Sequence, residues 1–176
     1  MLFNLISVVI LVATFDGLVY ASKTLESLEA KANSIAVPAP PPLEFLFAAN
    51  VTLGQFDSFE GPLGTRLNVP IVSANFSDAN GDIVARLIPG NTVEHGYVTA
   101  SGILFTDIVW SLRWEVDGKL AYLRALGIGK LPVQNLNYVQ LETDSEVYGD
   151  LNRRFIVANI TFAPPHISFF AAPSAF

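Results

Sequence analysis

The sequence predicts an all-β domain with antiparallel strands, arranged as a sandwich or a barrel. Apolar and polar residues alternate with a period of two over several runs, as they do in half-buried strands. Turn sequences separate these runs at roughly ten-residue spacing, which is typical of antiparallel all-β folds. Within the domain only residues 145–151 indicate a short helix or turn, so we expect strands to form nearly all of the core.

The chain begins with a segment typical of a secretory signal peptide. Residues 2–19 are almost wholly apolar, and the central run 5–13 is too short to cross a bilayer comfortably. Val19-Tyr20-Ala21 provides the small residues that signal peptidase recognises. We therefore expect cleavage after Ala21 and a secreted, extracellular protein with no stable membrane insertion. Asp16, and a start without Lys or Arg, leave an uncleaved anchor or a buried N-terminal helix as the alternative.

Three N-x-S/T sequons agree with export. They begin at Asn50, Asn75 and Asn159, and we expect glycans on these asparagines. The chain has no cysteine, which excludes disulfide bonds, a thiolate nucleophile and a cysteine-based metal site. The hydrophobic core must therefore supply the stability of the domain.

The charge balance argues against two classes of partner. The chain has 10 Lys and Arg residues against 16 Asp and Glu residues, and loss of residues 1–21 would remove only Asp16 from this count. Nucleic acids and anionic membranes bind basic surfaces, so neither is an expected partner. No motif for a bound cofactor occurs in the sequence, and we expect none.

A proline-rich tether is predicted ahead of the domain. Residues 22–36 have apolar residues at helical spacing for a turn or two, and Val37-Pro38-Ala39-Pro40-Pro41-Pro42 then forms a stretch that cannot join a sheet. The predicted organisation is a signal peptide at 1–21, a tether at 22–42 and a single domain at 43–176.

The first part of the domain predicts three strands. Over residues 43–53, Phe45 belongs to the face predicted to be buried, because the sequon Asn50 and Thr52 lie on the opposite face. Residues 71–76 alternate in the same way. The turn sequence at 78–82 then leads into a returning strand at 83–88.

The middle of the domain predicts two hairpins. Residues 97–100 and 103–116 turn at Ser101-Gly102, and an Asp117-Gly118 turn connects the second strand to 120–126. Further strands are predicted at 133–142 and 153–162. Residues 163–176, rich in Pro and Phe, are expected to form an exposed tail that is suited to packing against a partner.

Several short segments of the domain occur in a characteristic order. They are Leu43-Glu44-Phe45-Leu46-Phe47, Val51-Thr52-Leu53-Gly54, Gly64-Thr65-Arg66, Val69-Pro70-Ile71, Ile88-Pro89-Gly90, Asp117-Gly118 with Tyr122 and Gly127, and Leu151-Asn152. In this order and spacing the chain resembles, over about residues 43–162, a family of bacterial and fungal proteins called domain of unknown function 3237. The family has no assigned activity. The resemblance therefore implies only an antiparallel up-and-down β-barrel, lipocalin-like in outline, with side chains or a small ligand inside.

The sequence departs from the family pattern at two places. Ser73-Ala74 stands where the family usually has paired glycines. Asn91-Thr92-Val93-Glu94-His95 stands where an acidic-aromatic pair commonly follows the Pro-Gly turn, so Glu94 matches that acid only as a shifted equivalent.

Four residues are weak candidates for catalysis. Glu94 and His95 are the one acid–histidine neighbourhood in the middle of the domain, in an expected rim loop, but adjacent residues on extended chain point in opposite directions. A solvated loop is the simpler interpretation. Asp107 and Arg113 share one strand face, so they would be a base and an anion-binding group if that face lined the barrel. Trp110 and Trp114 occupy the opposite face, which favours a surface position for the charged pair.

The candidate ligand contacts are aromatic: Trp110, Trp114, Tyr122 and Phe45. An interior lined by these rings would suit an aromatic or lipidic molecule, although the rings would also simply fill a small barrel. The two histidines, His95 and His166, are far apart in the sequence, so we expect no metal site.

Three functions therefore remain open from the sequence. The first is binding of a small hydrophobic or aromatic molecule inside the barrel. The second is a cofactor-independent enzyme, an isomerase, cyclase or hydrolase, acting on such a molecule. The third is a glycosylated structural or interaction protein, for which a homodimer or an apolar surface patch would be evidence.

Overall fold

The computed structural model describes residues 39–90, 92–162 and 164–174. The predicted signal peptide and nearly all of the predicted tether lie outside the described residues. Residues 39–42 are exposed and belong to no strand. In the described part of the chain, no helix is both long and apolar enough to cross a membrane.

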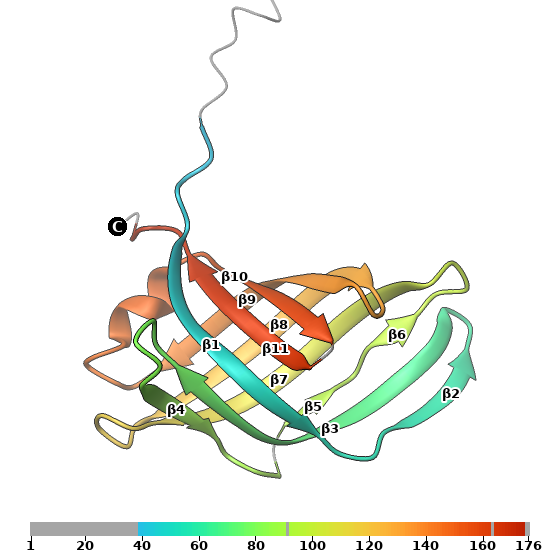
Figure 1. The fold of residues 1–176 in the computed structure, drawn as a ribbon, viewed down its shortest axis with the longest axis horizontal. Helices are drawn as coiled ribbons and strands as arrows, with labels where there is room; N and C mark the ends of the chain where they lie inside the picture. Colours follow the sequence, from blue (N-terminus) through green and yellow to red (C-terminus); the bar gives the residue numbers. More distant parts are fainter. Residues whose placement is uncertain (1–38, 91, 163, 175–176) are drawn as a thin grey trace, which may run out of the picture. The chain divides into compact units, whose positions relative to one another are not determined.

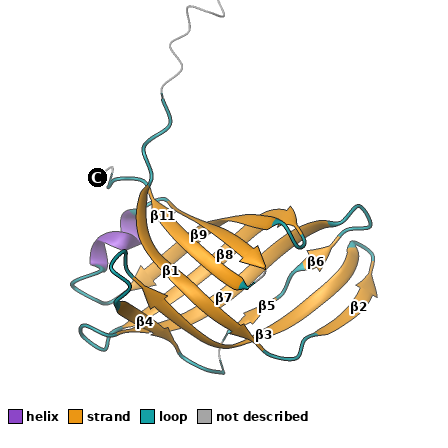
Figure 2. Ribbon diagram, viewed as in Figure 1, coloured by secondary structure: helices purple, strands orange, loops and turns teal. Residues whose placement is uncertain are grey.

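Strands dominate the described chain, as predicted, with one short 3-10 helix (Figure 2). The helix is η1 (Gly149–Arg153). The strands are β1 (Glu44–Leu53), β2 (Asp57–Gly61), β3 (Gly64–Ser77), β4 (Ile83–Leu87), β5 (Val93–Glu94), β6 (Tyr97–Val98), β7 (Ile103–Trp114), β8 (Leu120–Lys130), β9 (Gln134–Thr143), β10 (Ile156–Phe162) and β11 (Pro165–Ala171).

The prediction of an antiparallel barrel is confirmed. Its eight strands are β1, β11, β10, β9, β8, β7, β4 and β3, in that order around the barrel (Figure 1). β1 closes the barrel because it pairs with β11 on one edge and with the C-terminal half of β3 on the other. The N-terminal half of β3 pairs with β2 on one edge and with the short strands β5 and β6 on the other, and these two also pair with β7.

Strand β7 shows how alternation selects the interior. Every second side chain from Leu104 to Trp114 is buried, and the side chains between them are half-buried or exposed. Trp110 and Trp114 therefore lie inside the barrel, as their pattern predicts. Asp107 and Arg113 lie on the outer face, which is the interpretation that the tryptophans favoured.

An aromatic core fills one half of the barrel. The rings of Phe47, Phe76, Trp110, Trp114 and Phe169 contact one another with centroids 4.8 to 6.2 Å apart, several of them edge to face. All five side chains are almost completely buried. This half is a close-packed core in which the five aromatic rings contact one another directly.

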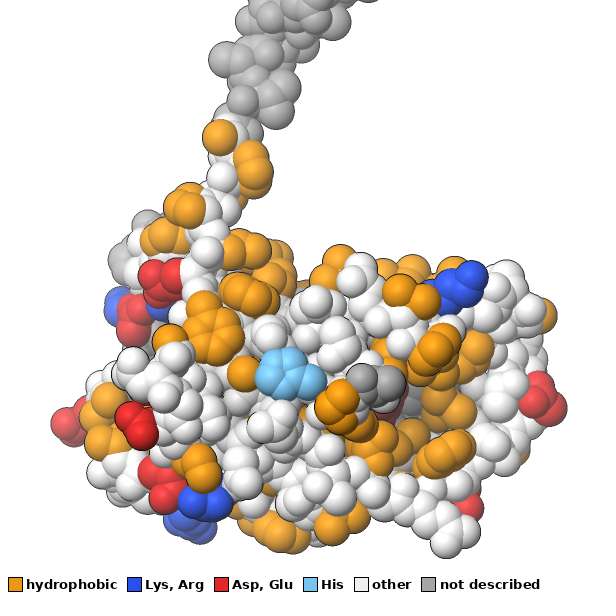
Figure 3. All heavy atoms as spheres, viewed as in Figure 1, with side chains coloured by type: hydrophobic (Ala, Val, Ile, Leu, Met, Phe, Trp, Pro, Cys, Tyr) orange, Lys and Arg blue, Asp and Glu red, His pale blue; other side chains and the backbone are white. Residues whose placement is uncertain are grey.

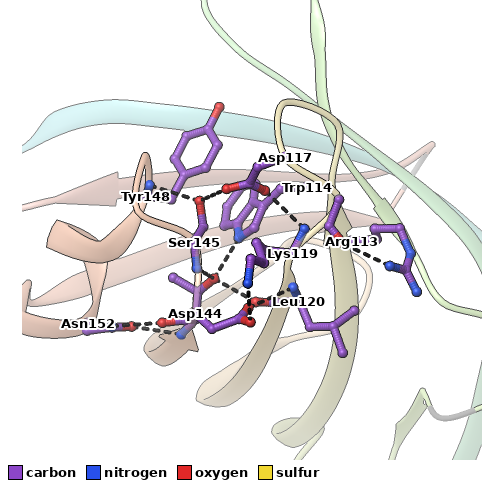
Figure 4. A network of polar contacts seen from close by, with 11 residues as sticks. Arg113, Trp114, Asp117, Lys119, Leu120, Asp144, Ser145, Tyr148 and Asn152 are labelled. Carbon is purple, nitrogen blue, oxygen red and sulfur yellow. Dashed lines mark hydrogen bonds and ion pairs between the residues drawn. The ribbon is translucent and has the colours of Figure 1, made fainter.

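The segment after β9 fastens the strand ends in this half (Figure 4). Trp114 donates from Nε1 to Thr143 Oγ1 at 2.8 Å, and its ring stacks on Tyr148 with centroids 3.9 Å apart. Asn152 accepts from the Thr143 backbone N–H at 2.8 Å and donates to the Thr143 carbonyl at 3.0 Å. Asn152 therefore holds the end of β9 against η1.

The other half of the barrel has polar residues and glycines at interior positions. Thr106 on β7 lies opposite Gly127 on β8, which lies opposite Asn137 on β9. Thr106 Oγ1 donates to Asn137 Oδ1 at 2.6 Å, and Asn137 in turn donates to the side chain of Asn135. A Cβ at position 127 would clash with the Asn137 amide. Glycine is therefore what allows an asparagine to be buried in this layer.

The expectation of an exposed C-terminal tail is wrong. Residues Pro165–Ala171 form β11, which lies between β1 and β10 and buries Ile167, Phe169 and Ala171. The segment pairs with a strand from the opposite end of the domain. Short-range sequence patterns do not reveal a partner strand that is so distant in the chain. The prolines at the start of this segment and shortly after its end are typical of irregular chain, which is why no strand was predicted.

The predicted inward position of Phe45 is also wrong. The pairing of β1 with β11 shifts between Phe45 and Phe47, which is the signature of a β-bulge. Phe47 and Ala49 consequently point inward, whereas Phe45 lies outside, 39% exposed, with its ring edge against Phe170.

The three sequon asparagines lie on outward-facing positions of strands. Asn50 and Asn75 are exposed and stand directly opposite each other on β1 and β3. Asn159 is half-buried, and its Oδ1 is buried without a hydrogen-bond partner. Their glycosylation stays a prediction.

Candidate functional site

Glu94 points into the barrel. It lies on β5, between Val69 of β3 and Ile108 of β7, and both of these neighbours are buried. Because successive residues of a strand alternate, the half-buried Glu94 faces inward and the exposed His95 faces outward. Gly96 leaves room for the acid, since a Cβ there would lie 3.1 Å from Glu94 Oε1. The expected rim loop thus contains a short strand, and the two residues point in opposite directions as predicted.

A small cavity of about 40 Å³ lies beside Glu94. A volume of this size accommodates a few water-sized groups, so a larger ligand would insert only one end. Leu53, at the end of β1, lines this cavity and is also exposed to solvent. Hydrophobic side chains gather on the face of the molecule shown in Figure 3. Trp110 and Glu94 line the cavity, and the rest of the lining is apolar: Val51, Leu53, Ile71, Ile108, Ile160, Phe162, Pro165 and Ile167.

Burial raises the pKa of Glu94 from 4.5 to about 7. The physical cause is desolvation, because the apolar lining cannot solvate a carboxylate as water does. Near neutral pH the acid and the carboxylate are therefore both populated. A carboxyl in this state is suited to donating or accepting a proton.

Two further polar groups in this region lack partners. Trp110 is 3% exposed and Thr92 is 7% exposed, yet Trp110 Nε1 and Thr92 Oγ1 make no hydrogen bond in the described structure. The register of β5 and β7, with Val93 opposite Val109, places Thr92 next to Trp110. A buried donor without a partner destabilises a protein by roughly 1–3 kcal/mol. A ligand that accepts these hydrogen bonds would remove that penalty.

The other candidate catalytic residues lie outside the barrel. Arg124 contacts both oxygens of Asp107, at 3.0 and 2.9 Å, and this hydrogen-bonded pairing holds the pKa of Asp107 below its usual value. Arg113 donates to the carbonyl of Gly118 at 2.8 Å. His95 lines a separate outer groove with Arg66. These residues therefore do not join Glu94 in one site.

The aromatic candidates divide in the same way. Trp110 lines the cavity, whereas Trp114 is buried in the aromatic core and its Nε1 is already hydrogen-bonded. Tyr122 and Phe45 lie on the outer face, so the expectation that they line the interior is not met. Among the described residues, no group of three or more His, Cys, Asp or Glu side chains could hold a metal ion.

Sequence reasoning missed Thr92 and the polar layer of Thr106, Asn135 and Asn137. Thr92 and Glu94 are two residues apart in the sequence, so on an extended strand they lie on the same face, and this spacing could have identified Thr92. For residues 133–142 no inward face was predicted from the sequence, and the larger apolar side chains Leu136 and Tyr138, which alternate with Asn135 and Asn137, point outward here.

The outer wall of the barrel carries exposed apolar side chains. Leu126 pairs with Tyr138, and Ile128 pairs with Leu136, on the outer faces of β8 and β9. Tyr138 stacks on the exposed Phe155, with ring centroids 5.4 Å apart. We name this group, Leu126, Ile128, Leu136, Tyr138 and Phe155, the outer apolar patch.

Comparison with known proteins finds the fold but no family. No family model and no curated protein matches the chain. Among solved structures, a protein of unknown function from Clostridium acetobutylicum is 19% identical, with a TM-score of 0.67, over 76% of this chain and 99% of that one. A β-barrel-like protein from Acinetobacter baumannii is 20% identical, with a TM-score of 0.58, over 77% and 98%.

An enzyme from Penicillium herquei has the same fold. It is 20% identical, with a TM-score of 0.62, over 78% of this chain and 98% of that one. At such identities, similarity establishes the fold and not the activity. The chain is therefore a small closed β-barrel whose architecture occurs both in proteins of unknown function and in an enzyme.

Proposed function

We propose that the barrel binds one small, mostly apolar molecule whose oxygen-bearing end enters the cavity beside Glu94. The observation that carries the proposal is the Glu94 carboxyl in an otherwise apolar lining that includes Trp110, whose buried Nε1–H has no partner; Thr92, with an unpartnered Oγ1, is next to Trp110 in the register. Apolar walls with a few placed polar groups are the usual composition of small-molecule sites. From the sequence alone we also propose that the protein is secreted, that it is glycosylated, and that it belongs to the family called domain of unknown function 3237.

Tryptophan fluorescence tests the binding directly. The Trp114→Phe variant leaves Trp110 as the single tryptophan, and it is titrated with cyclopentanone, benzaldehyde, phenol and octanol. We expect at least one of these to change Trp110 emission with saturation. The His95→Ala change in the same background is the control, because His95 faces outward, and its affinity should be unaltered.

The Trp110→Phe variant tests the hydrogen bond. Loss of one donor to a ligand oxygen is expected to weaken binding about tenfold, equivalent to roughly 1.4 kcal/mol. Isothermal titration calorimetry measures this loss without relying on fluorescence, and near-ultraviolet circular dichroism verifies that the barrel remains folded. Absence of binding by all four compounds would contradict the proposal.

The outer apolar patch favours a second candidate function, interaction with another protein surface. Its side chains adjoin one another on β8, on β9 and at Phe155, the residue before β10, and contiguous exposed apolar surface is typical of interaction sites. Sedimentation velocity of the wild type and of Leu136→Lys distinguishes self-association, which the lysine should abolish, from a monomer that the change leaves unaltered.

A further inference from the structure

We infer that the barrel site catalyses proton transfer at the carbon next to a carbonyl group, with Glu94 as the base and Trp110 as the hydrogen-bond donor to the carbonyl oxygen. This inference rests on the proposed binding function and adds a substrate class, an enolisable ketone or aldehyde. The reaction is keto–enol exchange and, where a double bond lies one carbon further along, a 1,3-shift of that double bond.

The donors determine the substrate class. An indole N–H only donates hydrogen bonds, and a carbonyl oxygen only accepts them, so the two are complementary. The Thr92 hydroxyl is a second buried donor without a partner, and Thr92 is next to Trp110 in the β5–β7 register. Donors placed in advance stabilise the negative charge that develops on the oxygen during enolisation more than they stabilise the neutral carbonyl.

The base stands next to these donors. Glu94 and Thr92 are two residues apart on the same interior face, a separation of about 6.6 Å along a strand. Both Glu94 and Trp110 line the same cavity. When the carbonyl oxygen of a ligand accepts a hydrogen bond from Trp110, the carbon next to that carbonyl can therefore lie toward the Glu94 carboxylate in the same cavity.

The apolar lining favours the chemistry. Val51, Ile71, Ile108 and Ile160 line the cavity, and none of the lining residues is Lys, Arg or His. A carboxylate that lacks solvent and an opposite charge is a stronger base than one in water, because taking up a proton relieves its desolvation.

The step balances without a further reactant. The Glu94 carboxylate removes the proton, the C–H electron pair forms the C=C bond, and the carbonyl π pair moves to the oxygen that Trp110 holds. The resulting Glu94 carboxylic acid exchanges its proton with solvent and then protonates either the same carbon, which gives hydrogen exchange, or the far carbon of an adjacent double bond, which gives the isomer. Nothing is oxidised or reduced.

Hydrogen exchange in D₂O measures this step separately from binding. The probe is cyclopentanone, whose α-hydrogens are followed by proton NMR with wild type, Glu94→Gln, Trp110→Phe and His95→Ala. Saturation-transfer difference signals from the same samples report binding. We expect the wild type and His95→Ala to accelerate exchange equally, and Glu94→Gln to lower the protein-dependent rate by about 10²-fold or more while still binding the ketone.

The outcomes separate this inference from the proposed function. Binding of cyclopentanone without accelerated exchange in the wild type overturns the inference and leaves the binding function intact. Exchange that persists in Glu94→Gln also overturns it, because another group must then remove the proton. In Trp110→Phe we expect the exchange rate to fall less than in Glu94→Gln. If the rate at saturating ketone falls more than the affinity for the ketone, the result supports a donor that stabilises the developing oxyanion. If neither this ketone nor the other three compounds bind, both proposals fail.

Discussion

The same strands build two different interiors in the two halves of this barrel. In one half, β7, β8 and β9 contribute Trp110, Leu123 and Leu141 to adjacent interior positions, and this layer is packed with aromatic rings. Two layers along the same strands, Thr106 and Asn137 flank Gly127, and the interior is polar. Backbone pairing continues unchanged through both halves.

The difference lies in side-chain volume and polarity alone. Large rings fill one half and supply stability, whereas beyond Trp110 a small cavity with a mostly apolar lining lies next to a titratable acid. A barrel can therefore keep its stability and its site apart while using a single continuous sheet. Mutations in the two halves should consequently have different effects, and three measurements test that difference.

The largest expected effect is in the aromatic half. Phe169 is 1% exposed and contacts the rings of Phe47, Phe76 and Trp110. Phe169→Ala should lower the free energy of unfolding by about 3–5 kcal/mol, because it removes buried surface and leaves a void. The matched control is Phe162→Ala at the half-buried cavity lining, which should cost markedly less. Urea denaturation of both variants measures the comparison, and equal losses would show that the halves do not differ in packing.

An intermediate effect is expected in the polar layer. Gly127→Ala introduces a methyl group where the Asn137 amide lies, and should cost about 1–3 kcal/mol of unfolding free energy. Combining it with Asn137→Ala removes the nearer of the two obstructing amides, and leaves the Asn135 Oδ1, which would lie 2.5 Å from the new Cβ, as the remaining obstacle. The double variant should therefore be more stable than the sum of the two single losses, as measured in a double-mutant cycle. Simple additivity would mean that the glycine is not required by the asparagine.

The smallest expected effect is the pH dependence of stability caused by Glu94. Its pKa is raised by burial from 4.5 to about 7, so the folded state binds this proton more tightly than the unfolded state. This contribution is complete below about pH 4.5 and is lost as the pH rises through 7. Between pH 5 and 8, Glu94 should lower the unfolding free energy by about 1–2 kcal/mol, after allowance for partial exposure.

Glu94→Gln should remove that part of the decline, whereas Glu142→Gln, at an exposed position, should retain it. Urea denaturation at the two pH values provides the readout. The same decline in wild type and Glu94→Gln would show that the acid is solvated rather than enclosed by the cavity half.

The sequence predicted the fold wherever structure depends on near neighbours. Alternation predicted the inward tryptophans and the outward Asp107 and Arg113, and local turn sequences predicted the hairpins on either side of β7. The β2–β3 hairpin was missed because its residues alternate weakly, and because β2 and the first five residues of β3 contain no buried side chain. The position of Phe45 depended on a bulge, and that of β11 on a partner strand far away in the chain. Neither leaves a local pattern in the sequence.

The candidate site was only partly predictable for the same reason. Glu94 was recognised as an acid near His95, and their opposite orientations followed from strand geometry. What makes Glu94 a candidate is its surroundings, since Trp110, Ile160 and Ile167 reach it from three other strands. Burial, and hence the raised pKa, is a property of that assembled environment.

The pairing of β1 with β11 also bears on when the protein can fold during its synthesis. Glu44 pairs with Ala171, so the barrel cannot close until strand β11 has left the ribosome. Until then β1 and β10 both expose unpaired edges, which are prone to pairing with other chains. We therefore expect closure to be slow relative to that of proteins with mainly local contacts, and chains that end before β11 to aggregate.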